Sequence, residues 1–209
     1  MRMRSILLVT LAAAALVGAL GGSAAAQVLS EPRQRQGYYV AGGFHAALSY
    51  NRDDGKGLGP WTGYGTTIRV GQLLTPRLGL GLQLDVSGAS GDGATASLVG
   101  LGVAGQVEIA RNLALHAGVG LGVISLDDPA DDDLQGGYGA AYTLALTYDW
   151  FPGNRRSGGW AITPGVRLRA VPSDTIDAFA VLAGIELSHW SGLPKNQLAL
   201  PDSEAYSRR

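Results

Sequence analysis

Apolar side chains alternate with small or polar side chains along most of the chain after residue 36. The alternation is cleanest in Leu78–Ser87, which reads LGLGLQLDVS. Successive side chains of a β-strand point to opposite faces, so a period of two predicts strands with one apolar face. The same period argues against a helix, because it does not keep apolar residues on one helical face.

Eight segments show this alternation, and each is long enough to cross a bilayer as a tilted strand, which takes about 9–11 residues. They are Tyr38–Tyr50, Trp61–Leu74, Leu78–Ser87, Ala94–Ala110, Leu113–Val123, Tyr138–Trp150, Trp160–Arg169 and Phe179–Ser188. Alternation of lipid-facing and lumen-facing residues is typical of membrane barrels. We therefore predict an all-β fold, an eight-stranded antiparallel up-and-down transmembrane β-barrel.

The links between the segments differ in length. Three are long and rich in Gly and Asp, namely Asn51–Pro60, Gly88–Thr95 and Ser125–Gly137, and two are tight, namely Thr75–Arg77 and Ala110–Asn112. Outer-membrane barrels have long outside loops and short periplasmic turns. We therefore expect the long links outside the cell and both chain termini in the periplasm. Two links fit this rule less well, because Phe151–Gly159 is long for a turn and Val171–Thr175 is short for a loop.

The first residues predict a cleavable export signal. Arg2 and Arg4 precede the apolar stretch Ile6–Leu20, and the small residues Ser23–Ala26 allow cleavage before Gln27. The apolar stretch is shorter than the roughly 18–20 residues of a spanning helix. We therefore divide the chain into a signal peptide (1–26), a polar N-terminal lead (27–36), a barrel (37–190) and a polar C-terminal tail (191–209).

Composition favours lipid over water as the solvent of the outer face. The chain contains 32 glycines among 209 residues, and its lysines are Lys56 and Lys195. Soluble domains normally cover their surfaces with charged residues, so a soluble lipocalin-like barrel is the less favoured alternative. The net charge is −1, and loss of Arg2 and Arg4 would make it −3. Without a basic stripe, nucleic acid is not an expected partner.

Aromatic residues near the segment ends predict two girdles at the levels where lipid meets water. The periplasmic girdle would contain Tyr38, Trp150, Trp160 and Trp190, and the outer girdle Tyr50, Trp61, Tyr64 and Tyr138. The competing interpretation is that aromatic residues favour strands in any sheet.

Charged residues at inward positions predict a network within the lumen, because unpaired buried charges are costly. The predicted members are Arg69, Asp85, Glu108, His116, Arg167, Arg169 and Glu186. The tight turns would place Arg69 near Gln83 and diagonal to Asp85, and Glu108 close to His116. A plug of ion pairs is the favoured interpretation, since an eight-stranded interior is just wide enough for side chains. A narrow porin-like channel for small solutes is the alternative.

With these features the chain resembles the small outer-membrane β-barrel family, the OmpA/OmpX-like transmembrane domains, over Gly37–Trp190. Its segment Gly184–Trp190 resembles the last strand of such barrels, whose terminal aromatic residue is part of the insertion signal, although here a polar tail follows. The resemblance implies a monomeric outer-membrane protein with a structural or surface-interaction role. It also implies contact with outer-membrane lipid and lipopolysaccharide, and insertion by the barrel-assembly machinery.

We expect no enzyme, cofactor or metal site, and a lipid A-modifying barrel enzyme is a disfavoured alternative. His45 and His116 occupy inward positions, while Ser188 and His189 are adjacent and so face opposite sides of a strand. The sequence has no GxSxG motif and no metal-spaced histidines. The acidic stretch Asp127–Asp133 lacks the spacing of a calcium loop, so a solvated loop is favoured over a cation site.

Overall fold

The computed structural model describes residues 35–53, 56–75, 77–128, 131–152, 158–173 and 176–192. At 53, 56–58, 128 and 131–135 it describes the backbone alone. The predicted signal peptide, most of the lead and the tail beyond residue 192 lie outside these ranges. No helix within the described ranges is long and apolar enough to span a membrane.

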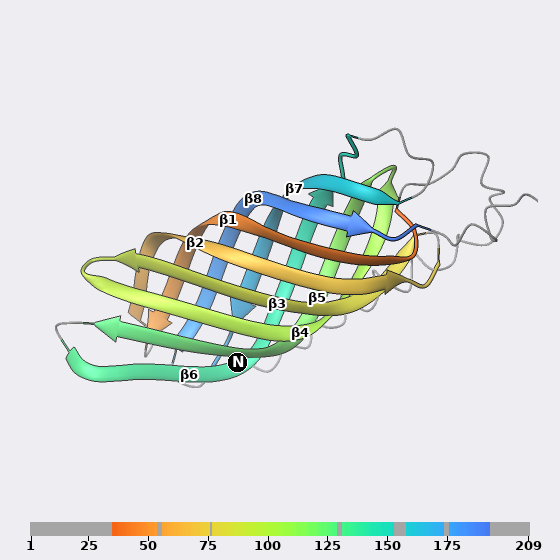
Figure 1. The fold of residues 1–209 in the computed structure, drawn as a ribbon. Coiled ribbons are helices and arrows are strands. Elements are labelled where there is room, and N and C mark those ends of the chain that lie inside the picture. The colour runs from red at the N-terminus through yellow and green to blue at the C-terminus, as the bar shows by residue number, and fades with distance from the viewer. Residues whose placement is uncertain are drawn as a thin grey trace, which may run out of the picture. The chain divides into compact units, whose positions relative to one another are not determined.

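Eight antiparallel strands close into one barrel, each hydrogen-bonded to the next in chain order, with β8 returning to β1 (Figure 1). They are β1 (Tyr38–Asp53), β2 (Lys56–Leu73), β3 (Leu78–Gly91), β4 (Ala94–Ala110), β5 (Leu113–Asp128), β6 (Asp131–Tyr148), β7 (Gly159–Val171) and β8 (Ile176–Trp190). The predicted fold class is confirmed. Closure gives every strand a hydrogen-bonded neighbour on each side, which a sheet in lipid requires because no water can satisfy a free edge there, although β6 and β7 pair only between Tyr142–Thr147 and Gly165–Ala170.

The two ends of the barrel differ. The base carries the tight β2–β3 and β4–β5 turns, and there the Gly192 amide donates to the Gln36 carbonyl at 3.2 Å, so the lead and the start of the tail meet. Both tight turns agree with the prediction. At the β4–β5 turn Asn112 adopts a φ of +63°, a left-handed conformation that asparagine tolerates better than most residues. The opposite end, the hairpin end, carries the β1–β2, β3–β4, β5–β6 and β7–β8 connections.

The three long polar loops predicted at the hairpin end are wrong. Most residues of Asn51–Pro60, Gly88–Thr95 and Ser125–Gly137 belong to strands, which pair almost to the hairpin tips. The β3–β4 tip is a two-residue turn in which Asp92 and Gly93 both have positive φ, as a type I′ turn requires. Loss of apolar alternation marks where a strand leaves the lipid, whereas backbone pairing continues without apolar side chains.

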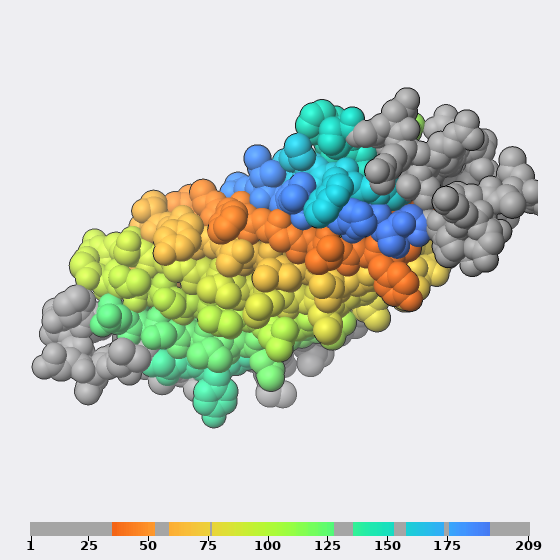
Figure 2. All heavy atoms as spheres, in the orientation of Figure 1, coloured from red at the N-terminus to blue at the C-terminus, as the bar shows by residue number. Residues whose placement is uncertain are grey.

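The apolar face of the sheet is the outer face, as Leu82, Leu101 and Leu121 show with exposures of 55, 60 and 77 %. The predicted parity of all eight segments is confirmed, and the soluble-barrel alternative, with its apolar face inside, is wrong. Outward side chains become polar towards both ends, at Gln72, Arg77 and Arg111 near the base and at Thr62, Ser90, Thr95 and Ser97 near the hairpin end. Figure 2 shows part of this outer wall over β1–β4.

Inward glycines leave space inside the barrel where β4 meets β5. Gly102 and Gly120 are cross-strand partners. A Cβ on Gly120 would collide with the Leu101 carbonyl oxygen, and one on Gly102 would collide with that of Val119. The close approach of these two strands therefore requires glycine, and it leaves this side of the lumen open to long side chains from the facing strands.

The outer face predicts a contrast between two arginine substitutions. Leu82→Arg should impair insertion, because arginine on the lipid face near the bilayer midplane costs about 2–4 kcal/mol. Ser97→Arg, a matched change on the exposed face near the hairpin end, should insert normally. The amount of each variant in the outer-membrane fraction measures the difference, and equal insertion would contradict an apolar belt around Leu82.

Candidate functional site

Two buried carboxylates each bind two arginines in the middle of the lumen. Glu186 accepts a bond from Arg167 Nη2 at 2.6 Å and bonds from Nε and Nη2 of Arg69. Asp85 Oδ1 lies 2.7 Å from Arg169 Nη2 and 3.8 Å from Arg167 Nη1. All five side chains are buried, so this cluster links β2, β3, β7 and β8 through charge pairs out of contact with water.

Strand register places the partners of this cluster. Arg69 lies directly opposite Gln83 and so diagonal to Asp85, in agreement with the predicted proximity. Thr67 lies opposite Asp85, to which its hydroxyl donates at 2.7 Å. Gly43 of β1 faces Glu186 across the β1–β8 pair. A Cβ on Gly43 would lie 2.7 Å from the Glu186 Cγ, so the absence of a side chain there gives the glutamate its room.

His116 joins the cluster through Arg69. The Arg69 Nη1 lies 2.8 Å from Nδ1 of His116, and Nε2 of the ring lies 2.8 Å from the Thr147 hydroxyl. A guanidinium can only donate, so Nδ1 is the acceptor, and Nε2 carries the proton of a neutral ring. His116 thus links Arg69 of β2 to Thr147 of β6.

The structure brings six of the seven predicted lumen residues together and places Glu108 elsewhere. Cross-strand register pairs His116 with Gln106 and pairs Glu108 with Ala114. The half-buried Glu108 carboxylate accepts from the Asn112 amide at 3.0 Å in the β4–β5 turn. Glu108 is therefore diagonal to His116 across the β4–β5 pair, two positions from the residue directly opposite it, as a turn centred on Arg111 places it.

A fourth arginine, Arg35 of the lead, enters the lumen at the base, where it is 3 % exposed. Its Nε lies 2.9 Å from Asp149 Oδ2, its Nη2 donates to Gln106 Oε1 at 3.2 Å, and its Cζ lies 4.8 Å from the centre of the Trp190 ring. Burial lowers the pKa of the Arg35 guanidinium, and the Asp149 carboxylate opposes that shift.

Sequence reasoning missed Arg35 because the lead lacks the alternation that marks inward positions. The balance of inward charges could have indicated such a residue. The inward positions carry four acids but only three arginines, and the surplus acid implies a base from outside the strands. The four acids are Asp85, Glu108, Asp149 and Glu186.

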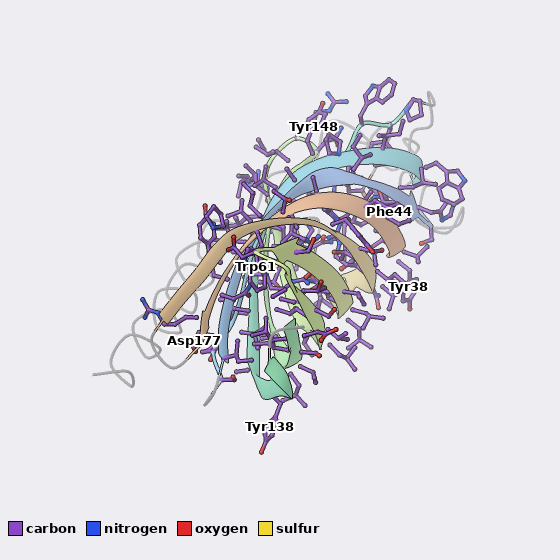
Figure 3. The ribbon with its side chains drawn as sticks, turned by 90° about the vertical axis from the view of Figure 1, so that its left-hand side faces the viewer. Tyr38, Phe44, Trp61, Tyr138, Tyr148 and Asp177 are labelled. Atoms are coloured by element: carbon purple, nitrogen blue, oxygen red, sulfur yellow. The ribbon has the colours of Figure 1, made fainter. Side chains whose placement is uncertain are left out.

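Six of the eight aromatic residues predicted for girdles are exposed on the outer face, namely Tyr38, Tyr50, Tyr64, Tyr138, Trp150 and Trp160. In Figure 3, Tyr138 projects away from the strands. The predictions for Trp61 and Trp190 are wrong, because these side chains are buried within the barrel at 2 and 3 % exposure. Trp61 shares the parity of Thr67, and Trp190 shares that of Glu186, so strand alternation turns both rings inward despite their terminal positions.

Trp61 belongs to an apolar layer that crosses the lumen at the hairpin end. Its neighbours are large or small apolar side chains, chiefly Leu98, Ile124, Leu126, Val171 and Ile176 with Ala89, Ala94, Ala96, Ala141 and Ala178. The indole NH of Trp61 donates to Asp92 Oδ2 at 3.4 Å in the β3–β4 turn. The lumen therefore contains three layers, which run from the Arg35 layer at the base through the charge cluster to the apolar layer.

The part of the chain that the structure describes contains neither a cluster of metal ligands nor a paired Ser188 and His189. No group of three or more His, Cys, Asp or Glu side chains there could hold a metal ion. Ser188 points inward and bonds to Thr163 at 2.9 Å, while the His189 ring lies 4.8 Å from that of Trp160. Ser188 and His189 therefore occupy opposite faces of β8, as their adjacency predicts.

The shared carboxylate makes Glu186→Gln the most informative change in the cluster. The variant should lose about 3–5 kcal/mol of stability, because it removes the charge partner of buried Arg69 and leaves buried Arg167 only its 3.8 Å contact with Asp85. The temperature at which the folded band disappears from gels of unheated and heated samples measures this loss. Asp127→Asn, at an exposed position of the hairpin end, serves as the control and should leave that temperature unchanged.

No family model and no curated protein sequence matches the chain. Among solved structures, Ail, the attachment invasion locus protein of Yersinia pestis, matches with 12% identity over 73% of this chain and 99% of its own, at a TM-score of 0.54. Neisserial surface protein A matches with 15% identity over 74% and 97% at 0.48, and the N-terminal barrel domain of Pseudomonas aeruginosa OprF with 12% identity over 74% and 99% at 0.44. The match to Ail extends over nearly all of that chain and shows a shared fold. The chain has the fold of the small eight-stranded outer-membrane β-barrels.

Proposed function

We propose that the protein is an integral outer-membrane barrel with a closed lumen, which serves as a structural or surface-interaction element of the envelope rather than as a channel. The observation that carries this proposal is the filled interior behind an apolar exterior. A buried charge cluster and an apolar layer lie one above the other inside the barrel, while leucine, valine and isoleucine side chains cover the outside.

The outer face supports placement in a bilayer. Tyr38 and Tyr50 lie twelve positions apart on β1, and Tyr138 and Trp150 lie twelve positions apart from β6 into the link that follows it. At about 3.3 Å per residue and a tilt of about 40°, twelve residues span about 30 Å along the barrel axis. The apolar band of outer-membrane barrels is about 25 Å tall, so both pairs of aromatic residues suit the two interfaces.

The lumen supports the absence of steady conduction. A permeating ion would have to displace the Arg69–Glu186 and Arg167–Glu186 pairs and then cross the layer around Trp61, which offers it few polar ligands. Stripping an ion of water in such surroundings costs several kcal/mol. The narrow-channel alternative needs both layers to move.

The hairpin end supports a role at the cell surface. On β6 the strand begins at Asp131, seven positions before Tyr138, so the β5–β6 hairpin continues beyond the proposed outer interface. Both described chain ends lie at the base, whereas the β5–β6 hairpin extends beyond the proposed interface at the other end, which suits a periplasmic base and hairpins outside. In this orientation the barrel is a monomer in contact with lipid and lipopolysaccharide, inserted by the barrel-assembly machinery.

Planar-bilayer recording tests the closed lumen. The wild-type protein should conduct negligibly. Arg69→Ala should melt at a lower temperature, because it leaves the Glu186 carboxylate with one arginine instead of two, yet it should open only rarely while the Trp61 layer stays in place. Combining Arg69→Ala with Trp61→Ala should increase the frequency of openings. Steady wild-type conductance that persists in Arg69→Ala would overturn the closed lumen and favour the narrow channel.

Fractionation and surface labelling test the location and the orientation. The protein should sediment with the outer membrane. Tags inserted after Asp54 or Asp131 should be labelled on intact cells, whereas a tag after Arg77 in the β2–β3 turn should be labelled only after lysis. Labelling of the Arg77 tag alone on intact cells would invert the orientation.

A further inference from the structure

The base of the barrel contains a pocket that fits a guanidinium group, and the chain's own lead fills it. Arg35 stands three residues before β1, outside the strands that form the wall. Its side chain nevertheless has almost no exposed surface. Three groups of different chemistry surround it, namely the Asp149 carboxylate, the Gln106 carboxamide and the Trp190 indole.

These three groups match the shape of the cation as well as its charge. The Asp149 carboxylate lies 2.9 Å from the guanidinium Nε in an ion pair, and Gln106 Oε1 accepts a hydrogen bond from a different nitrogen, Nη2, at 3.2 Å. The Trp190 ring lies 4.8 Å from the guanidinium carbon, within the range of a cation–π contact. A planar, delocalised cation uses spread acceptors and a ring face together, whereas a compact, strongly hydrated ammonium does not.

The walls of the pocket are held by contacts that do not involve Arg35. Asp149 accepts a bond from the Thr163 hydroxyl at 2.7 Å. The Trp190 ring stacks on Tyr39, with 4.9 Å between ring centres. The side chain of Gln106 lies against Gly79, where a Cβ would collide with its amide group. Removal of the Arg35 side chain should therefore leave the three recognition groups in place.

The lead reaches the pocket through a short backbone clamp. Gly37 has a φ of +74°, and a Cβ at this position would collide with the Ser191 hydroxyl. The Gln36 carbonyl accepts from the Gly192 amide at 3.2 Å, and the Tyr38 amide donates to the Ser191 hydroxyl at 2.9 Å. With the Leu73 amide bonded to the Gly37 carbonyl and the Ser191 amide bonded to the Tyr38 carbonyl, four hydrogen bonds hold residues 36–38 in the described part of the chain, fewer than a full strand ladder makes.

We propose that the base of the barrel is a guanidinium-binding site that Arg35 occupies in cis, and that it accepts the side chain of an arginine-bearing peptide when the lead withdraws. The site is independent of the conductance of the lumen, because the charge cluster and the Trp61 layer lie above it. Any cation could satisfy a purely structural ion pair at this place, whereas a recognition site requires the guanidinium itself.

The test is chemical rescue of Arg35→Ala in detergent micelles, followed by the temperature at which the folded gel band disappears. The variant should melt below the wild type. Millimolar guanidinium chloride should restore most of the lost temperature, and potassium chloride at the same ionic strength should not. Arg77→Ala, which removes an exposed arginine at the base, should show no guanidinium response. If Arg35→Ala folds poorly, its refolding yield takes the place of the melting temperature and should rise with guanidinium.

Two further measurements identify the groups and the ligand. Adding Asp149→Asn to Arg35→Ala should weaken guanidinium binding by about tenfold to a hundredfold, because it removes the negative charge that pairs with the guanidinium. A short arginine peptide amide should bind Arg35→Ala and not the wild type with its lead in place, and the lysine counterpart should bind neither. Equal rescue by potassium, or no rescue by either salt, would overturn the proposal and leave Arg35 a structural ion pair. Failure of the proposed function would appear instead in the fractionation or the bilayer recordings.

Discussion

The carboxylate of Glu186 is the contact on which the interior of the barrel depends. It bonds Arg69 of β2 and Arg167 of β7, two strands on opposite sides of β8, so a single side chain fixes three parts of the wall. Such a group is costly to bury and stable only when every partner is present. The remaining interior follows from it, because Arg69 positions His116, and Arg167 shares Asp85 with Arg169.

The closure of the barrel follows from a different constraint, the need to satisfy every backbone hydrogen bond in lipid. In hydrocarbon no water can replace a missing backbone partner, so the strands must pair all the way round. Closure at eight strands leaves a lumen that side chains fill. Each strand therefore has two sets of alternating residues. The outward-facing residues contact lipid, and the inward-facing residues form the charge cluster and the other layers of the lumen. Gly102 and Gly120 reconcile the two, since they let β4 and β5 curve closely without adding volume inside.

The fold could be predicted from the sequence because one repeated signal, alternation, sets both strand identity and face. Leu82 and Gln83 illustrate this, as adjacent residues on opposite sides of the wall. The same alternation assigns Trp61 and Trp190 to the inner face, although their positions near strand ends suggested girdles. Contacts across the lumen were less accessible, because pairings such as Arg69 with Glu186 join strands that are not neighbours. The burial of Arg35 in the lumen could not be predicted in this way, since no periodic pattern describes the lead.

The clamp between the lead and the tail bears on the order of assembly. Its hydrogen bonds join Gln36 with Gly192 and Tyr38 with Ser191, residues separated by more than 150 positions in the chain. Contacts between such distant segments form only after the intervening chain has been arranged, because loop closure must precede them. The clamp and the Trp190 wall of the Arg35 pocket can therefore form only when β8 has met β1. Arg35 can thus bind in its pocket only after the barrel has closed.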